Sequence, residues 1–66
     1  MRLIINGDSR EFADGLKLVD LVEQLGMRGD RLAIELNRDI VPRTRWPETP
    51  LQEGDRLEIV HFVGGG

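Results

Sequence analysis

The sequence contains no cysteine and no tyrosine, and only 5% of its 66 residues are aromatic. The absence of cysteine excludes a disulfide framework, a thiolate nucleophile and a cysteine-based zinc site. No apolar run approaches the length that crosses a bilayer, and the start of the chain turns polar at Asn6, too early for a signal peptide. We therefore expect a cytoplasmic protein without a membrane partner.

Size and charge restrict the function further. A chain of 66 residues forms a single domain, spanning 1–66, that buries only about 60% of the surface its unfolded form exposes. Little of that small core is left to build a cleft for a substrate. Nine Lys and Arg against 12 Asp and Glu give a formal charge of −3, so we predict no nucleic-acid partner.

Catalytic side chains are scarce. The only histidine is His61, and because it continues the parity of Leu57 and Ile59 we expect it to be partly buried or at the rim of the core. No spacing suggests a triad, a metal site or a phosphate-binding loop. The hydroxyl groups belong to Ser9, Thr44 and Thr49. The sequence therefore predicts a chain that is not an enzyme and binds no cofactor or metal.

Five interior glycines divide the remaining sequence into short periodic segments. Asn6-Gly7 is a strong hairpin signal, and apolar residues at helical spacing begin at Leu18 and end before Gly26. Residues 43–50 contain Pro47 and Pro50 close to Trp46, so we expect irregular structure there, with Trp46 covering one end of the core. The pattern predicts strands at 2–6, 9–13, 32–36, 40–42 and 56–62, and one helix at 18–25.

This order predicts an α+β domain with one mixed five-stranded sheet and one main helix packed across one face. If the first and last strands are adjacent and parallel at the sheet centre, the fold is the ubiquitin-like β-grasp. The alternation of apolar and polar residues leaves open an antiparallel α+β sandwich with another strand order.

The last three residues, Gly64, Gly65 and Gly66, have no side chains to pack. We expect 62–66 to form a flexible tail that can enter a narrow site on another protein and present the carboxylate of Gly66. Strand parity places Val60 and Phe62 on the face opposite Leu57 and Ile59, and we predict that they bind a partner together with Val63. A frayed end without a function is the alternative.

Several segments are similar to one family. Asn37 precedes Ile40-Val41-Pro42-Arg43, Trp46 follows three residues later, and Ile59-Val60-His61-Phe62-Val63 runs into the glycines. The chain resembles the ThiS family of sulfur carrier proteins of thiamine biosynthesis over essentially its whole length.

The resemblance implies a β-grasp fold and a reaction cycle on partner enzymes. A ThiF-like adenylyltransferase would use ATP and Mg²⁺ to adenylate the carboxylate of Gly66. Sulfur derived from cysteine through a desulfurase persulfide would convert it to a thiocarboxylate, and a ThiG-like thiazole synthase would accept that sulfur. Two alternatives remain: the small subunit of molybdopterin synthase, and a β-grasp binding module with an inert tail.

Overall fold

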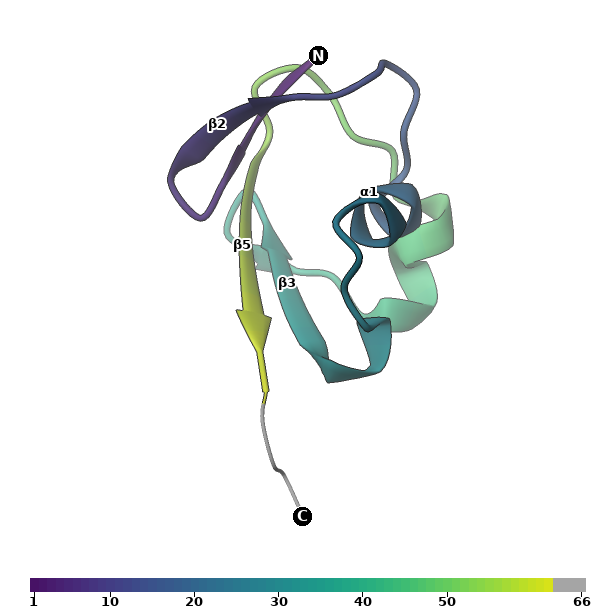
Figure 1. The fold of residues 1–66 in the computed structure, drawn as a ribbon. Helices are drawn as coiled ribbons and strands as arrows, with labels where there is room; N and C mark the ends of the chain where they lie inside the picture. The colour runs from purple at the N-terminus through teal and green to yellow at the C-terminus, as the bar shows by residue number, and fades with distance from the viewer. Residues whose placement is uncertain (63–66) are drawn as a thin grey trace.

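The computed structural model describes residues 1–62, so of the predicted tail 62–66 only Phe62 is described, and its amide is bonded to the Arg31 carbonyl; Val63, Gly64, Gly65 and Gly66 lie outside the described residues. The described chain forms one sheet in the order β2-β1-β5-β3-β4 (Figure 1). Its strands are β1 (Arg2–Ile5), β2 (Asp8–Glu11), β3 (Leu32–Leu36), β4 (Asp39–Ile40) and β5 (Arg56–His61). Within residues 1–62, no helix is long and apolar enough to cross a membrane.

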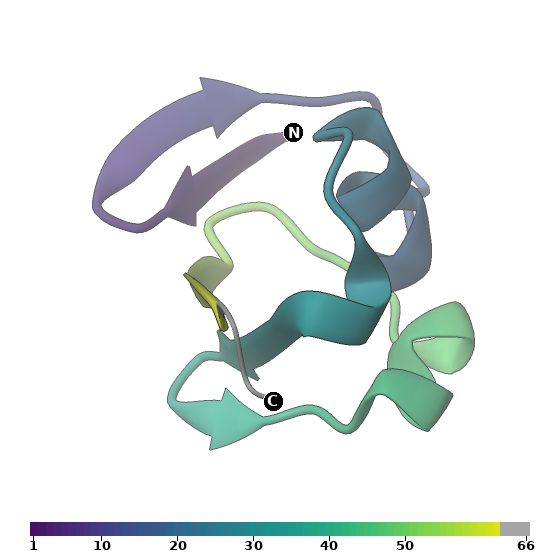
Figure 2. The same cartoon turned by 60° about the horizontal axis from the view of Figure 1, so that its bottom comes forward.

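The centre of the sheet decides between the two predicted folds. β1 and β5 pair in parallel, with Ile4 opposite Arg56 and Ile5 opposite Leu57, whereas the pairs β1–β2, β3–β5 and β3–β4 are antiparallel. The main helix, α1 (Leu18–Gln24), lies against one face of this mixed sheet (Figures 1 and 2). The predicted β-grasp is confirmed, and the antiparallel alternative is wrong.

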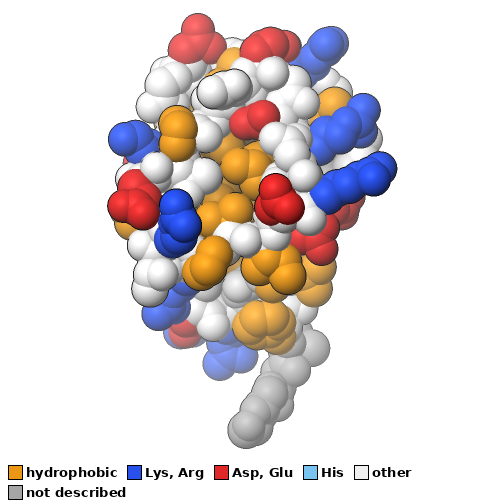
Figure 3. All heavy atoms as spheres, turned by 180° about the vertical axis from the view of Figure 1, so that it is seen from behind, with side chains coloured by type: hydrophobic (Ala, Val, Ile, Leu, Met, Phe, Trp, Pro, Cys, Tyr) orange, Lys and Arg blue, Asp and Glu red, His pale blue; other side chains and the backbone are white. Residues whose placement is uncertain are grey.

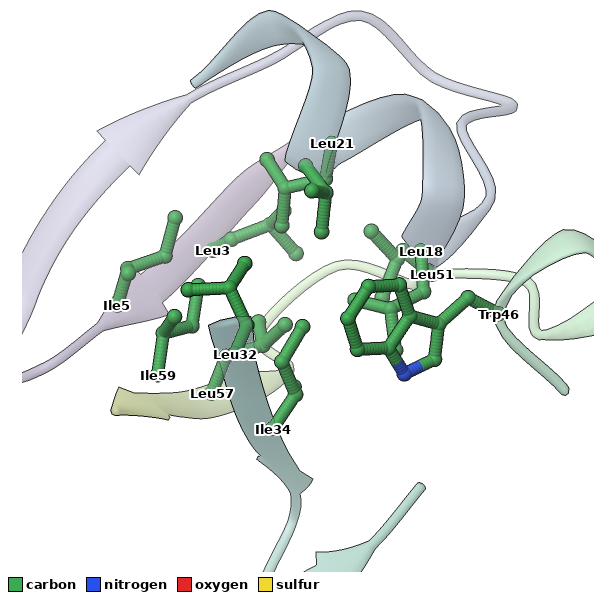
Figure 4. Close-up of a cluster of buried hydrophobic side chains, with 11 residues drawn as sticks. Leu3, Ile5, Leu18, Leu21, Leu32, Ile34, Trp46, Leu51, Leu57 and Ile59 are labelled. Carbon is green, nitrogen blue, oxygen red and sulfur yellow. The ribbon is translucent and has the colours of Figure 1, made fainter. Parts of the chain in front are cut away.

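The core fills the space between the sheet and α1 (Figure 4). Alternate residues of β1, β3 and β5 point inward because successive side chains of a strand face opposite sides. Leu18, Leu21 and Val22 of α1 meet them at helical spacing. The buried apolar side chains are Leu3, Ile5, Leu18, Leu21, Val22, Leu32, Ile34, Trp46, Leu51, Leu57 and Ile59.

The ends of α1 follow from local sequence. Lys17 occupies the N-cap without a side-chain hydrogen bond, but the carboxylate of Asp20 accepts from the Lys17 amide at 2.9 Å. At the other end Leu25 is the C-cap and Gly26 has a φ of 71°, the left-handed conformation expected after a helix. The helix is thus one residue shorter than predicted.

Residues 43–50 differ from the prediction of irregular structure. They contain a 3-10 helix, η2 (Arg43–Glu48), packed beside α1 (Figure 2). The sequence does not predict this helix because it is short and buries only Trp46, so no periodic apolar pattern marks it. Trp46 is 2% exposed, and its indole N–H donates to the Val41 carbonyl at 2.9 Å, which confirms its predicted place in the core.

The other differences are local: β1 and β5 each end one residue earlier than predicted, and β2 spans Asp8–Glu11 in place of 9–13. A second 3-10 helix, η1 (Gly29–Arg31), precedes β3 and was not predicted. The fourth strand begins one residue earlier than expected and ends at Ile40, because the chain turns at Val41 and Pro42 towards η2. This strand lies at an edge of the sheet.

Candidate functional site: the exposed end of strand β5

The candidate site lies where β5 leaves the body of the domain (Figure 1). Leu57 and Ile59 are buried, whereas Val60 and Phe62 on the other face are 58% and 52% exposed. Figure 3 shows hydrophobic side chains at the surface close to where the described chain ends. The predicted exposure of Val60 and Phe62 is confirmed. Their role in binding stays a prediction, as does that of Val63.

Hydrogen bonds on both sides hold this part of β5. On the β3 side, the Phe62 amide donates to the Arg31 carbonyl at 2.9 Å. On the β1 side, the Asn6 side chain accepts from the Ile59 amide at 2.7 Å and donates to the Ile59 carbonyl at 3.2 Å. The apolar side chains are therefore presented from a fixed strand.

The start of β5 is fixed by Asn37, a residue of the motif noted in the sequence. Asn37 and Arg38 both have positive φ, 51° and 76°, in the turn between β3 and β4. The Asn37 side chain accepts from the Arg56 amide and donates to the Asp55 carboxylate, each at 3.0 Å. These bonds join the turn to β5. They also stabilise a positive-φ backbone conformation, which is unfavourable for most residues other than glycine. The structure thus gives Asn37 a structural role.

Charged residues continue the exposed face towards the start of β5. Glu58 lies directly opposite Glu35 of β3, and both side chains are exposed. Together with Asn37, Arg38 and Arg56, they line an open hollow of about 360 Å³. Across residues 1–62, neither glutamate forms an ion pair within 4 Å. The face therefore changes from like-charged carboxylates to apolar side chains along β5.

A second hollow, of about 450 Å³, lies at the β4 edge and was not predicted from the sequence. Its exposed apolar residue is Ile40, which is 73% exposed. Ile40 belongs to a two-residue strand, too short to show an alternating pattern. The lining residues are Leu36, Asn37, Asp39, Ile40, Val41, Pro42, Arg45 and Thr49.

The candidate catalytic groups lie on separate elements. Ser9 is on β2, Thr44 is in η2, and the Thr49 hydroxyl donates to the Arg45 carbonyl at 2.6 Å. His61 is exposed, so of the two predicted positions partial burial is wrong, and the rim of the core remains. Its parity keeps it on the side of the buried Leu32, with which it pairs at the start of β3, but it lies beyond the end of β1 at Ile5, near the point where β5 leaves the body of the domain. The residues in 1–62 contain no group of three or more His, Cys, Asp or Glu arranged to hold a metal ion.

Two surface charges are perturbed by their neighbours. A hydrogen bond from Arg28 at 3.1 Å lowers the pKa of the Asp30 carboxyl. The Met1 amine has a raised pKa, chiefly because it donates a hydrogen bond to Asp14, with an N···O distance of 3.0 Å. The Met1 contact joins the start of the chain to Asp14, whereas Asp30 directly precedes Arg31, whose carbonyl accepts from the Phe62 amide.

The fold and the end of the sequence define the class of protein. It is a ubiquitin-like β-grasp domain, and its last described strand presents apolar residues just before a run of glycines. Comparison with known proteins specifies the family. The ThiS family model matches residues 3–66, and the chain belongs to the ThiS family.

Individual relatives agree with this assignment. The chain is 32% identical over 66 residues to the sulfur carrier protein ThiS of Escherichia coli, with full coverage of both chains. A crystal structure of a thiamine biosynthesis protein (ThiS) from Geobacter metallireducens superposes with a TM-score of 0.87 at 29% identity, covering 100% of each chain. These matches favour ThiS over the molybdopterin synthase alternative.

Longer proteins also contain a similar segment. The chain is 39% identical to a thiazole synthase of Paramagnetospirillum magneticum over 66 residues, which are all of this chain and 20% of that protein. The chain thus spans about a fifth of the length of the thiazole synthases that it matches.

Proposed function

We propose that this domain is a sulfur carrier for thiamine biosynthesis and that it carries sulfur as a thiocarboxylate on Gly66. The observation that supports this proposal best is the position of Val60 and Phe62, more than half exposed on the strand that leads to the glycines. Apolar side chains held on a rigid strand are suited to binding a protein surface. Family membership supports the same cycle.

The chain acts in this cycle as a substrate of other enzymes. A ThiF-like adenylyltransferase binds the exposed end of β5 and uses ATP and Mg²⁺ to form an acyl-adenylate at Gly66, releasing pyrophosphate. The terminal sulfur of a persulfide, made by a cysteine desulfurase, attacks the acyl carbon and expels AMP. A thiol then reduces the resulting acyl disulfide and leaves the thiocarboxylate, with a disulfide as the other product.

The thiocarboxylate suits sulfur delivery for a chemical reason. A thioacid is ionised at neutral pH, and sulfur is more polarisable than oxygen, so the loaded end is a better nucleophile than a carboxylate. A ThiG-like thiazole synthase accepts the sulfur, consistent with the thiazole synthases that contain a similar segment. The absence of cysteine removes an internal thiol that would compete for the adenylate. We place the cycle in the cytoplasm.

Intact mass spectrometry tests the proposal. The chain is incubated with ATP, Mg²⁺, the adenylyltransferase and a persulfide source, and its mass should increase by the difference between sulfur and oxygen. Fragmentation should place that increment on Gly66. A variant without Gly66 is the control, because it changes the acceptor and leaves residues 1–62 intact. Sulfur loading of that variant, or no loading of the wild type, would contradict the proposal.

A further inference from the structure

The two sides of β5 differ in how far their hydrogen bonding extends. Towards β3, the ladder continues to the Phe62 amide, which donates to the Arg31 carbonyl. Towards β1, the ladder ends earlier, because β1 stops at Ile5 and the Asn6 side chain makes the last pair of bonds, with Ile59. Figure 1 shows the hairpin of β1 and β2 ending before the lower part of β5.

The alternation of a strand then fixes the direction of the His61 backbone. The Leu57 carbonyl and both backbone groups of Ile59 bond towards β1, whereas the Arg56 carbonyl and the Phe62 amide bond towards β3. His61 has the parity of Leu57 and Ile59, so its N–H and C=O point to the side that β1 has vacated. No residue in 1–62 forms a backbone hydrogen bond with His61 on that side.

The two outer edges of the sheet are protected against the addition of another strand. The open edge of β5 beside His61 differs from them. β2 carries exposed charged residues along its length, at Asp8, Arg10 and Glu11. β4 has only two residues and is followed within two positions by Pro42. Charges, short strands and proline are the usual ways in which proteins block an open edge. Val60, His61 and Phe62 include no proline and no Lys, Arg, Asp or Glu, although only His61 directs its backbone groups to the open side.

We propose that an extended segment of the adenylyltransferase adds to this open edge as a strand and pairs with the backbone of His61. The inference rests on the proposed function and specifies how the partner binds the same site. Backbone pairing would align an extended chain with β5, while Val60 and Phe62 bind the partner through their exposed face. The partner would thereby fix the direction in which β5 continues.

Amide hydrogen exchange of the wild-type chain, alone and in complex with the adenylyltransferase, tests the inference. In the free chain the His61 amide should exchange faster than the Phe62 amide, which is already bonded to Arg31. In the complex, His61 exchange should slow by about tenfold or more, as expected for an amide that gains a hydrogen bond. Phe62 is the internal reference.

Each other outcome has a definite meaning. Binding with unchanged His61 exchange would overturn strand addition and leave the proposed function standing. Absence of binding would overturn both. Protection of His61 in the free chain that rises with chain concentration would identify a second copy as the occupant and overturn the choice of partner.

A pair of variants provides an independent test. His61→Pro removes the N–H on the open side and leaves the amides that bond to β3, whereas His61→Ala removes only the side chain. We expect His61→Pro to weaken binding of the adenylyltransferase by about tenfold, which is the loss of one hydrogen bond plus an unpaired partner carbonyl. His61→Ala should bind within about twofold of the wild type on the same ground. Equal affinities of the two variants would contradict the inference, and the exchange experiment decides the matter if His61→Pro does not fold.

Discussion

Asn6 and Ile59 are 53 positions apart in sequence and form a two-hydrogen-bond pair between a side chain and a backbone. The Asn6 amide group takes the place of a peptide unit and extends the pairing of β1 with β5 after β1 has ended. Asn6 also adopts a φ of 51° in the hairpin turn. One residue therefore serves both a local turn and the centre of the sheet.

Replacement of Asn6 should destabilise the domain. Asn6→Ala removes both hydrogen bonds and places a residue with a Cβ but no turn-stabilising group at positive φ, so we expect a loss of about 2–3 kcal/mol. Asn6→Gly tolerates positive φ and should lose less. Urea unfolding of the two variants measures the difference. If Asn6→Ala were as stable as the wild type, the pair with Ile59 would contribute nothing.

Gly29 is a second position where packing limits substitution. A Cβ added there would lie 3.0 Å from Cζ3 of Trp46, whose ring is buried in the core. Overpacking costs about 1–3 kcal/mol, and the loss of chain entropy in the unfolded state offsets about 0.4–1 kcal/mol, so Gly29→Ala should lose about 1 kcal/mol net.

The control for Gly29 is a double-mutant cycle with Trp46→Phe. Phenylalanine lacks the outer ring that carries Cζ3, so Gly29→Ala should cost less in that background. Trp46→Phe alone also loses the hydrogen bond to the Val41 carbonyl, and the cycle subtracts that loss. Equal costs of Gly29→Ala in both backgrounds would show that Trp46 is not the obstacle.

The opposed glutamates of β3 and β5 predict a stabilising substitution. Like charges directly opposite one another are unfavourable, so Glu58→Lys, which creates an attractive pair with Glu35, should stabilise the domain by about 0.2–1 kcal/mol. High salt should reduce the gain. The matched control is Glu35→Lys with Glu58→Lys, which restores repulsion. Thermal unfolding that ranks the double variant above the single one would contradict this interpretation.

The Asp30 pair predicts a small dependence of stability on acid pH. The hydrogen bond from Arg28 lowers the pKa of Asp30 below its usual 3.8 in the folded state. The contribution of this pair to the free energy of unfolding is therefore complete above pH 3.8. It is lost as the pH falls through the folded-state pKa of Asp30. Carboxyl titration by NMR should give a pKa below 3.8 in the wild type and a higher value in Arg28→Gln. The same pKa in both chains would remove Arg28 as the cause.

The exposed apolar residues predict a separation of binding from folding. Phe62→Glu should weaken binding of the adenylyltransferase by about tenfold or more, because a charge would be placed in an apolar contact, and should leave unfolding unchanged since Phe62 is 52% exposed. Ile40→Glu is the matched control, because Ile40 is 73% exposed on the edge strand β4. Titration calorimetry compares the two. Equal weakening by both variants, or by neither, would argue against the proposed surface.

The sequence predicted those helices and strands in which the periodic pattern of apolar residues extends over several positions. α1 and the strands β1, β3 and β5 follow from apolar periodicity, and the Asn6-Gly7 turn follows from its tolerance of positive φ. The centre of the sheet required the structure, since parallel pairing of β1 with β5 leaves no local signal. η1 and η2 were missed because a single turn or a single buried side chain produces no period.

The candidate site was predictable to a similar extent. Strand parity gave the exposure of Val60 and Phe62, because β5 alternates regularly. The same rule failed for His61, since parity determines the side of the sheet and the neighbouring elements determine burial. The open edge beside His61 depends on where β1 ends relative to β5, which the sequence of either strand alone does not contain.

The central position of β5 also has a consequence for biosynthesis. β1 is made first, yet its neighbour on one side, β5, is made last among the described strands, and β5 supplies Leu57 and Ile59 to the interior. A nascent chain that stops before residue 56 lacks the middle of its sheet and cannot complete its fold, and contacts so distant in sequence form slowly. The domain can therefore fold only after β5, the strand that leads to the glycines, has been translated. An activating enzyme that recognises β5 on a folded surface would thus bind only fully folded domains.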